Sequence, residues 1–317
     1  MKTSTSKRLR WNVAIWLAAG LFMTSTAGMA SGPIMPDPKA EARHQPQVEE
    51  TANSIPLVNI TAPSSGGVSR NEYETFNVPD KGAILNNSYT LSKTELAGYV
   101  PGNNNMAERP AKIIVNEVTG AGSTSMDGFL EVAGNRADVV IANPNGITVN
   151  GGGFINTGKA FLTTGKPVYD GEDHLQRFDI TGGDILIEGK GLGGKETESL
   201  AILSRAVKIN AGIWAKDLHI TTGANTVDAK TLEASAIEGK GGRPAFALDT
   251  AAIGGMYAGR ITLVGTEKGL GVNNSGAWSA EDNLTLDWNG DLKNSGTIYS
   301  KGNTDLRASR LENDKTI

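Results

Sequence analysis

The sequence of 317 residues contains no cysteine. This absence excludes disulfide bonds, thiolate metal sites and a cysteine nucleophile. Histidine is scarce as well, because only His44, His174 and His219 occur and they lie far apart along the chain. This spacing does not predict a metal site, and we expect neither a metal nor another cofactor.

Hydrophobic residues, without glycine, make up 38% of the chain. Glycine (40 residues) and asparagine (25 residues) are plentiful, and both favour tight turns. The composition therefore predicts many short strands joined by turns. The net charge of −4 becomes −8 for residues 31–317, because residues 1–30 hold four basic and no acidic residues. An acidic chain argues against nucleic acid as a main partner.

The first thirty residues have the features of a secretory signal peptide. Four basic residues lie between positions 2 and 10, and an apolar run follows at 13–23. That run is too short to span a membrane comfortably. Gly28 and Ala30 place small residues at the −3 and −1 positions, so we expect cleavage between Ala30 and Ser31. The general secretory machinery is thus an expected partner.

Residues 31–53 contain four prolines and no hydrophobic period, so we expect a disordered leader. From about residue 55 onward, apolar and polar residues alternate over short stretches, as in 261–264 and 284–288. Alternation with period two is typical of strands. No long helix is predicted, and residues 199–206 fit either a short helical turn or a strand.

The C-terminal part contains a repeat of 20 residues, in which Asn274-Ser275-Gly276 recurs as Asn294-Ser295-Gly296. Three further pairs of positions correspond: Trp278 with Ile298, Asn283 with Asn303, and Leu286 with Leu306. Such a period, built from strands, predicts a solenoid whose apolar side chains stack between coils. The chain stops inside what looks like a repeat, so we expect either a longer rod or a covered last coil.

Residues 76–167 carry the most specific pattern. It comprises FNVPDKGAILNNS (76–88), IIVNEVTG (113–120), EVAGNRADVVIANPNGITVNGGGFINT (131–157) and AFLTTGKP (160–167). In this order and spacing these segments closely resemble the secretion domain of two-partner-secretion exoproteins, the filamentous-haemagglutinin-like family. Residues 247–272 look most like the branch that includes contact-dependent growth-inhibition exoproteins. We therefore assign 54–272 to the secretion domain and 273–317 to the start of filamentous repeats.

The resemblance implies an all-β, right-handed parallel β-helix with an N-terminal cap and hairpins outside the helix. It also implies recognition in the periplasm by the periplasmic binding domains of a cognate outer-membrane transporter, followed by folding outside the cell. A secreted or cell-surface location is expected, and the domain would lead an adhesin or contact-dependent toxin that meets a target-cell or host surface. We do not expect an enzyme.

The resemblance also assigns roles to particular residues. Transporter recognition and turn formation are implied for Asn143, Pro144, Asn145, Gly146 and Ile147, whose Asn-Pro-Asn-Gly sequence suits a type I turn. A second recognition motif is implied at Asn103, Asn104, Asn105 and Met106, where the family often has Asn-Pro-Asn-Leu. Structural roles are expected for Asn86, Asn87, Asn116 and Glu117. Relatives often carry a cysteine pair where this chain has Val149 and Gly152.

Two other interpretations remain open from the sequence. A self-contained β-helical adhesin would bind a surface through its rod, although no sequence feature specifies a ligand. A carbohydrate-active enzyme on the same fold would need converging carboxylates; the candidates by residue type are Asp138, Asp170, Asp173, Asp179 and Asp184. Three tryptophans in the strand pattern fit the core, the rod surface or a carbohydrate contact: Trp214, Trp278 and Trp288.

Overall fold

The computed structural model describes residues 32–107 and 109–317. Every element in this part of the chain is a strand, apart from two short 3-10 turns, η1 (Ala42–His44) and η2 (Asn104–Met106). None of its helical segments is long and apolar enough to cross a membrane. The predicted signal peptide (1–30) and its cleavage site between Ala30 and Ser31 lie outside the described residues.

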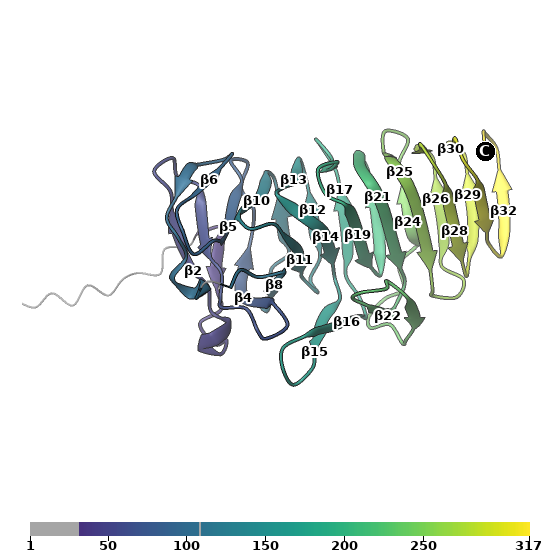
Figure 1. Ribbon diagram of the computed structural model, residues 1–317. Helices are drawn as coiled ribbons and strands as arrows, with labels where there is room; N and C mark the ends of the chain where they lie inside the picture. Colours follow the sequence, from purple (N-terminus) through teal and green to yellow (C-terminus); the bar gives the residue numbers. More distant parts are fainter. Residues whose placement is uncertain (1–31, 108) are drawn as a thin grey trace, which may run out of the picture. The chain divides into compact units, whose positions relative to one another are not determined.

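The strands stack in successive coils, and most coils contribute to three ladders of hydrogen-bonded strands (Figure 1). The first ladder consists of β2 (Gln47–Glu50), β3 (Pro56–Asn59), β5 (Ala83–Asn87), β10 (Phe129–Gly134), β13 (Gly152–Ile155), β18 (Leu192–Gly194), β21 (Gly212–Thr222), β25 (Gly255–Gly265), β27 (Ala277–Ala280) and β30 (Thr297–Ser300). From β3 onward all of these pairings are parallel.

The second and third ladders complete the coils. The second consists of β1 (Ile34–Pro36), β4 (Val68–Phe76), β8 (Ile113–Val118), β11 (Ala137–Ala142), β14 (Thr157–Thr163), β19 (Ser199–Ser204), the long strands β21 and β25 again, β28 (Leu284–Trp288) and β31 (Thr304–Arg307). The third consists of β9 (Thr124–Met126), β12 (Ile147–Val149), β17 (Asp184–Ile187), β20 (Ala206–Ile209), β24 (Phe246–Thr250), β26 (Gly271–Asn274), β29 (Asp291–Asn294) and β32 (Arg310–Asn313).

The prediction of a disordered leader at 31–53 is wrong for residues 32–53. In this segment β1 pairs antiparallel with β4, and β2 pairs antiparallel with β3. Ile34 is buried in the main core. These antiparallel strands give the first coils partners for backbone groups that would otherwise form an open sheet edge. Proline does not prevent this, because β1 is an edge strand and its register shifts at Pro36. Proline is tolerated on edge strands and at bulges.

Two antiparallel units lie outside the coils. One is the hairpin of β6 (Ser92–Thr94) and β7 (Gly98–Val100). The other is a sheet of β15 (Lys166–Tyr169), β16 (Leu175–Ile180), β22 (Asn225–Asp228) and β23 (Ala234–Ala236). The second unit covers the outer face of the second ladder and forms a separate apolar cluster there. Within it, the rings of Phe161 and Phe178 lie 6.0 Å apart.

The predicted 20-residue repeat is visible in the strand register. Trp278 pairs with Ile298 and Leu286 with Leu306, and all but the half-buried Leu306 lie in the core. The buried Asn274 and Asn294 also stack from coil to coil through a side-chain hydrogen bond. Residues 199–204 form strand β19 rather than a helical turn. The predicted all-β parallel β-helix, with an N-terminal cap and hairpins outside it, is therefore confirmed.

Candidate functional site

The predicted motif at 143–147 forms the corner between β11 and β12. Gly146 N–H donates to the carbonyl of Asn143 over 3.1 Å, which closes a four-residue turn. Oδ1 of Asn143 accepts the N–H of Asn145 at 2.9 Å, and its Nδ2 donates to the Gly122 carbonyl at 2.9 Å and to Thr124 Oγ1 at 3.0 Å. One amide thus fixes its own turn and ties it to the preceding coil.

Burial divides this motif into two parts. Asn143, Gly146 and Ile147 are buried, whereas Pro144 and Asn145 are exposed. Gly146 has a φ of +110°, and a Cβ there would lie 3.0 Å from the carbonyl oxygen of Asp184, so glycine is required at this corner. The turn therefore presents Pro144 and Asn145 to solvent on a rigid base.

The second predicted motif, at 103–106, has the same hydrogen-bond pattern. Oδ1 of Asn103 accepts the N–H of Asn105 at 2.9 Å, and Met106 N–H donates to the Asn103 carbonyl at 3.1 Å. Nδ2 of the buried Asn103 donates to the carbonyls of Ile60 and Asn86, both at 2.9 Å. The exposed Asn104 takes the place that Pro144 has in the first motif. The turn is thus kept without proline.

The four residues expected to be structural are all buried. Asn86 donates to the carbonyl of Pro101, between β7 and η2, at 3.0 Å. Asn87 donates to the carbonyl of Ala111, between η2 and β8, at 2.9 Å. Asn116 accepts the hydroxyl of Tyr73 at 3.0 Å and donates to a carbonyl in the next coil. These contacts supply partners for polar backbone groups inside the rod. Burial raises the pKa of Glu117, and the nearby Arg70 partly opposes that shift.

Val149 and Gly152 adjoin one another. Val149 is fully buried, and a Cβ at Gly152 would lie 3.0 Å from its Cγ1. The valine side chain therefore fills the space between the two positions.

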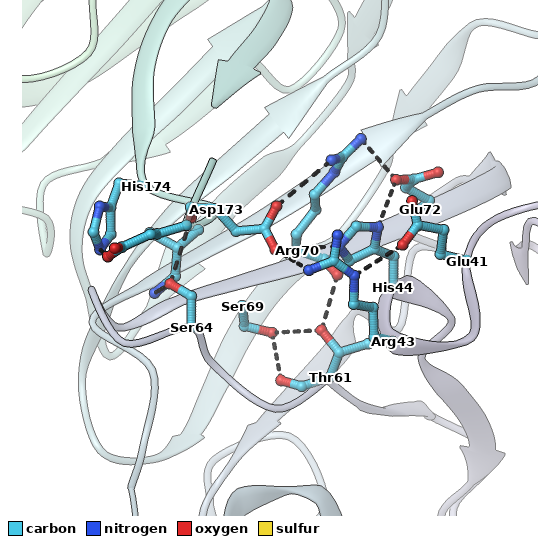
Figure 2. Close-up of polar contacts among 12 residues, drawn as sticks. Glu41, Arg43, His44, Thr61, Ser64, Ser69, Arg70, Glu72, Asp173 and His174 are labelled. Carbon is cyan, nitrogen blue, oxygen red and sulfur yellow. Dashed lines mark hydrogen bonds and ion pairs between the residues drawn. The ribbon is translucent and has the colours of Figure 1, made fainter. Parts of the chain in front are cut away.

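The structure also brings together a polar cluster that the sequence does not predict, shown in Figure 2. We call it the clasp, and it consists of Arg43, His44, Arg70, Glu72 and Asp173. Asp173 Oδ2 lies 2.6 Å from Arg43 Nη1 and 3.7 Å from His44 Nε2. Arg70 Nη2 lies 2.8 Å from Glu72 Oε1, which is also 3.1 Å from His44 Nδ1. The clasp joins η1, β4 and the loop between β15 and β16.

Two contacts around the clasp strengthen this junction. The guanidinium carbon of Arg70 lies 4.4 Å from the centre of the Tyr169 ring, a cation–π geometry. His174 contacts Asp170 through Nδ1 at 2.9 Å, and its ring packs over Gly66, where a Cβ would lie 1.9 Å from it. The loop between β15 and β16 is therefore held against the first coils.

The carboxylates proposed for a carbohydrate-active enzyme do not converge. Asp138 accepts the backbone N–H of Lys159, Asp179 pairs with Arg177, and Asp184 lies 3.7 Å from Lys208. Asp170 and Asp173 belong to the loop between β15 and β16. The first three side chains lie on different strands, and the two in the loop contact His174 and Arg43, respectively. Each carboxylate thus has its own partner, and the five do not form a paired acid and base.

The sequence is similar to a family of secretion domains and to two longer proteins. Residues 33–298 match the family model described as the TPS secretion domain. The chain is 42% identical over 298 residues to "Toxin CdiA" of Yersinia pestis, covering 87% of this chain and 9% of that protein. It is 44% identical over 260 residues to "16S rRNA endonuclease CdiA" of Enterobacter cloacae, covering 81% of this chain and 8% of that protein.

A crystal structure of a filamentous hemagglutinin secretion domain is also similar. Its TM-score is 0.75 at 32% identity, and the match covers 89% of this chain and 97% of that one. The chain spans less than a tenth of the length of the two relatives named above.

Proposed function

Because the chain belongs to the family of two-partner-secretion (TPS) secretion domains, we propose that the periplasmic binding domains of a cognate outer-membrane transporter recognise it. The family implies such a transporter, and TPS exoproteins are secreted through the outer membrane. In our proposal the general secretory machinery delivers the chain to the periplasm, the transporter binds it there, and the β-helix folds outside the cell.

The observation that carries this proposal is the division of the 143–147 turn into a buried base and an exposed tip. Asn143 is buried and fully hydrogen-bonded, whereas Pro144 and Asn145 contact solvent. The bonds from Asn145 N–H to Asn143 Oδ1 and from Gly146 N–H to the Asn143 carbonyl involve only residues 143–146, so this tip can form before the coils stack. A tip held in this way loses little conformational entropy on binding. The exposed Asn104 occupies the same position in the second turn, and we propose that both tips contact the transporter.

We further propose that the domain leads a longer adhesin or contact-dependent toxin, which meets a target cell or host surface. The support is that one similar protein is named a toxin and another an rRNA endonuclease, and that the match covers less than a tenth of the length of each. The TPS secretion domain itself is a secretion module rather than a catalyst. Within the matched range, we propose that the secretion domain passes into filamentous repeats from about residue 273.

The test is secretion of the chain from a bacterium with an outer membrane, with and without a candidate transporter. The proposal predicts protein in the medium only when the transporter is present, and accumulation in the periplasm without it. Appearance in the medium without any transporter would contradict it, as would retention in the periplasm with the cognate transporter.

A further inference from the structure

The outward side of the first ladder carries a row of aromatic residues. Successive register positions along seven coils are Phe129, Gly153, Gly193, Trp214, Tyr257, Ser279 and Tyr299. The exposed fractions of Phe129, Tyr257 and Tyr299 are 43%, 40% and 50%. Four of seven positions in one line are thus aromatic and accessible at least in part, a pattern that core packing does not explain.

Glycines keep the two central rings close to the sheet. A Cβ at Gly212 would lie 2.5 Å from the Trp214 ring, and a Cβ at Gly255 would lie 2.8 Å from the Tyr257 hydroxyl. Both rings therefore occupy space that a side chain two residues earlier would otherwise fill. The rings of Trp214 and Tyr257 are nearly parallel, with 17° between their planes and 6.2 Å between their centres. They form a fixed aromatic surface across two coils.

A hollow of about 510 Å³ adjoins this surface at Tyr257, and we call it the aromatic hollow. Trp214 lies beside Tyr257, just outside the lining. Its lining includes Lys195, Lys216, Tyr257, Gly259, Ser279 and Glu281. Gly259 lets the two backbones approach closely at the edge of the hollow, because a Cβ there would lie 2.5 Å from the carbonyl oxygen of Lys216. Small-molecule sites in proteins commonly combine aromatic walls with a few polar groups of this kind.

The charge of the hollow favours an anionic occupant. Glu281 is paired with Lys301, whereas Lys195 and Lys216 form no ion pair with any residue of the described part. Two lysines are therefore available on a chain whose net charge is −4. They would attract acidic groups at short range.

The backbone of this face excludes a peptide bound by strand addition. β21 is paired with β18 on one side and β25 on the other, and β25 is paired with β27. No backbone edge is therefore open here, and strand addition requires one. A single-stranded nucleic acid also combines flat rings with negative charge, so it is the alternative occupant that the test must exclude.

We propose that the aromatic hollow binds an acidic glycan. A pyranose ring packs on Trp214 and Tyr257, carboxylate groups contact Lys195 and Lys216, and the hydroxyl of Ser279 takes part in hydrogen bonding. The site is formed by four successive coils of the folded rod, those of β18, β21, β25 and β27. It therefore operates after folding and independently of the transporter contact at 143–147.

The test is calorimetric titration of the purified folded chain with β-1,4-linked mannuronate hexasaccharide. Cellohexaose has the same linkage without carboxylates, and a thymidine hexanucleotide represents nucleic acid. We expect the mannuronate probe to bind at least about tenfold more tightly than cellohexaose, a difference of about 1.4 kcal/mol. We expect Trp214→Ala to lower its affinity at least about tenfold. Replacing Lys195 and Lys216 together by Gln should remove the preference for the acidic probe.

Matched controls separate binding from folding. Tyr99→Ala removes an exposed aromatic ring from the β6–β7 hairpin, and Lys293→Ala removes an exposed lysine from the third ladder; both should bind like the native chain. Circular dichroism and melting temperature identify a variant that has failed to fold, and Trp214→Phe then keeps an aromatic ring in place. Absence of mannuronate binding, equal loss in the controls, or tighter binding of the hexanucleotide would each overturn the proposal.

Discussion

The carboxylate of Asp173 accepts a hydrogen bond of 2.6 Å from Nη1 of Arg43, although 130 positions separate the two residues. The contact holds the loop between β15 and β16 against η1, in the N-terminal cap. The clasp therefore joins residues that are far apart in the sequence. It forms only when the loop that carries Asp173 packs against η1. The stability of the cap is thus coupled to a hairpin that lies outside the coils.

Replacing Asp173 by Asn should lower the free energy of unfolding by about 1–2 kcal/mol, because Arg43, His44 and Arg70 lose a charged partner. The Asp173 and Arg70 side chains are 19% and 23% exposed, whereas Arg43 is 62% exposed, so solvent screens the contact with Arg43 and keeps the expected loss small. Asparagine tolerates the φ of +57° at this position, which limits the change to the side chain. Urea unfolding measures the difference.

Asp179→Asn is the matched control for the clasp. Asp179 is on the same hairpin sheet, but its pair with Arg177 is exposed, so the loss should be under about 0.5 kcal/mol. Equal effects in the two variants would show that the clasp contributes nothing beyond an ordinary surface ion pair.

The pKa of His219 predicts a decrease in stability with acid. Burial lowers this pKa from 6.5 to about 4, so the folded state favours the neutral ring. The stabilisation is complete above pH 6.5 and is lost as the pH falls toward 4. Between about pH 7.5 and about pH 5 the contribution should fall by about 2 kcal/mol.

His219→Gln removes this titration. Between about pH 7.5 and about pH 5, the unfolding free energy of this variant should therefore fall by about 2 kcal/mol less than that of the native chain. Urea unfolding at both pH values measures this double difference. Parallel pH profiles for the two proteins would mean that His219 titrates normally in the fold.

The 143–147 turn allows stability and recognition to be separated. Asn143→Asp removes the amide donor to Gly122 and Thr124, and should cost about 1–3 kcal/mol. Pro144→Ala removes an exposed ring and no hydrogen-bond donor, so stability should change by less than about 1 kcal/mol.

Both variants should nevertheless reach the medium at least about tenfold less efficiently through the cognate transporter, while only the Asn143 variant unfolds earlier in urea. The two measurements together identify a contact role for the exposed tip. Normal secretion of the Pro144 variant would restrict the turn to a structural role.

Stacked asparagines should stabilise the C-terminal coils. Asn274 Nδ2 donates to Asn294 Oδ1, and Asn294 Nδ2 donates to Asn313 Oδ1, both at 2.7 Å. Asn294→Asp loses one donor and places a carboxylate beside another oxygen, so we expect a loss of about 2–3 kcal/mol. Thermal unfolding checks this against Asn303→Asp, an exposed position in the same repeat, which should change little.

The sequence predicts the coils well because each coil is a local pattern. Inward residues such as Trp278 and Ile298 recur at the spacing of one coil, so their register follows from the repeat itself. The corner at Asn143 is also predictable, because asparagine, proline and glycine each restrict the backbone locally.

The cap and the clasp are not predictable in this way. β1 is a three-residue strand whose order comes from pairing with β4, and no local signal in a proline-rich segment indicates that partner. In the sequence, Asp173 is only one of five candidate carboxylates for a carbohydrate-active enzyme. Its role depends on the three-dimensional approach of Arg43 and Arg70, which no spacing in the sequence encodes.

The most direct test of the central claim, that this chain is a transporter-recognised secretion domain, is transport of a passenger. The chain is fused ahead of a reporter that has no secretion signal of its own, and the reporter is measured in the medium and the periplasm. We predict reporter in the medium only with the cognate transporter and an intact 143–147 turn. Reporter that reaches the medium equally well without the transporter, or that stays in the periplasm with it, would contradict the claim.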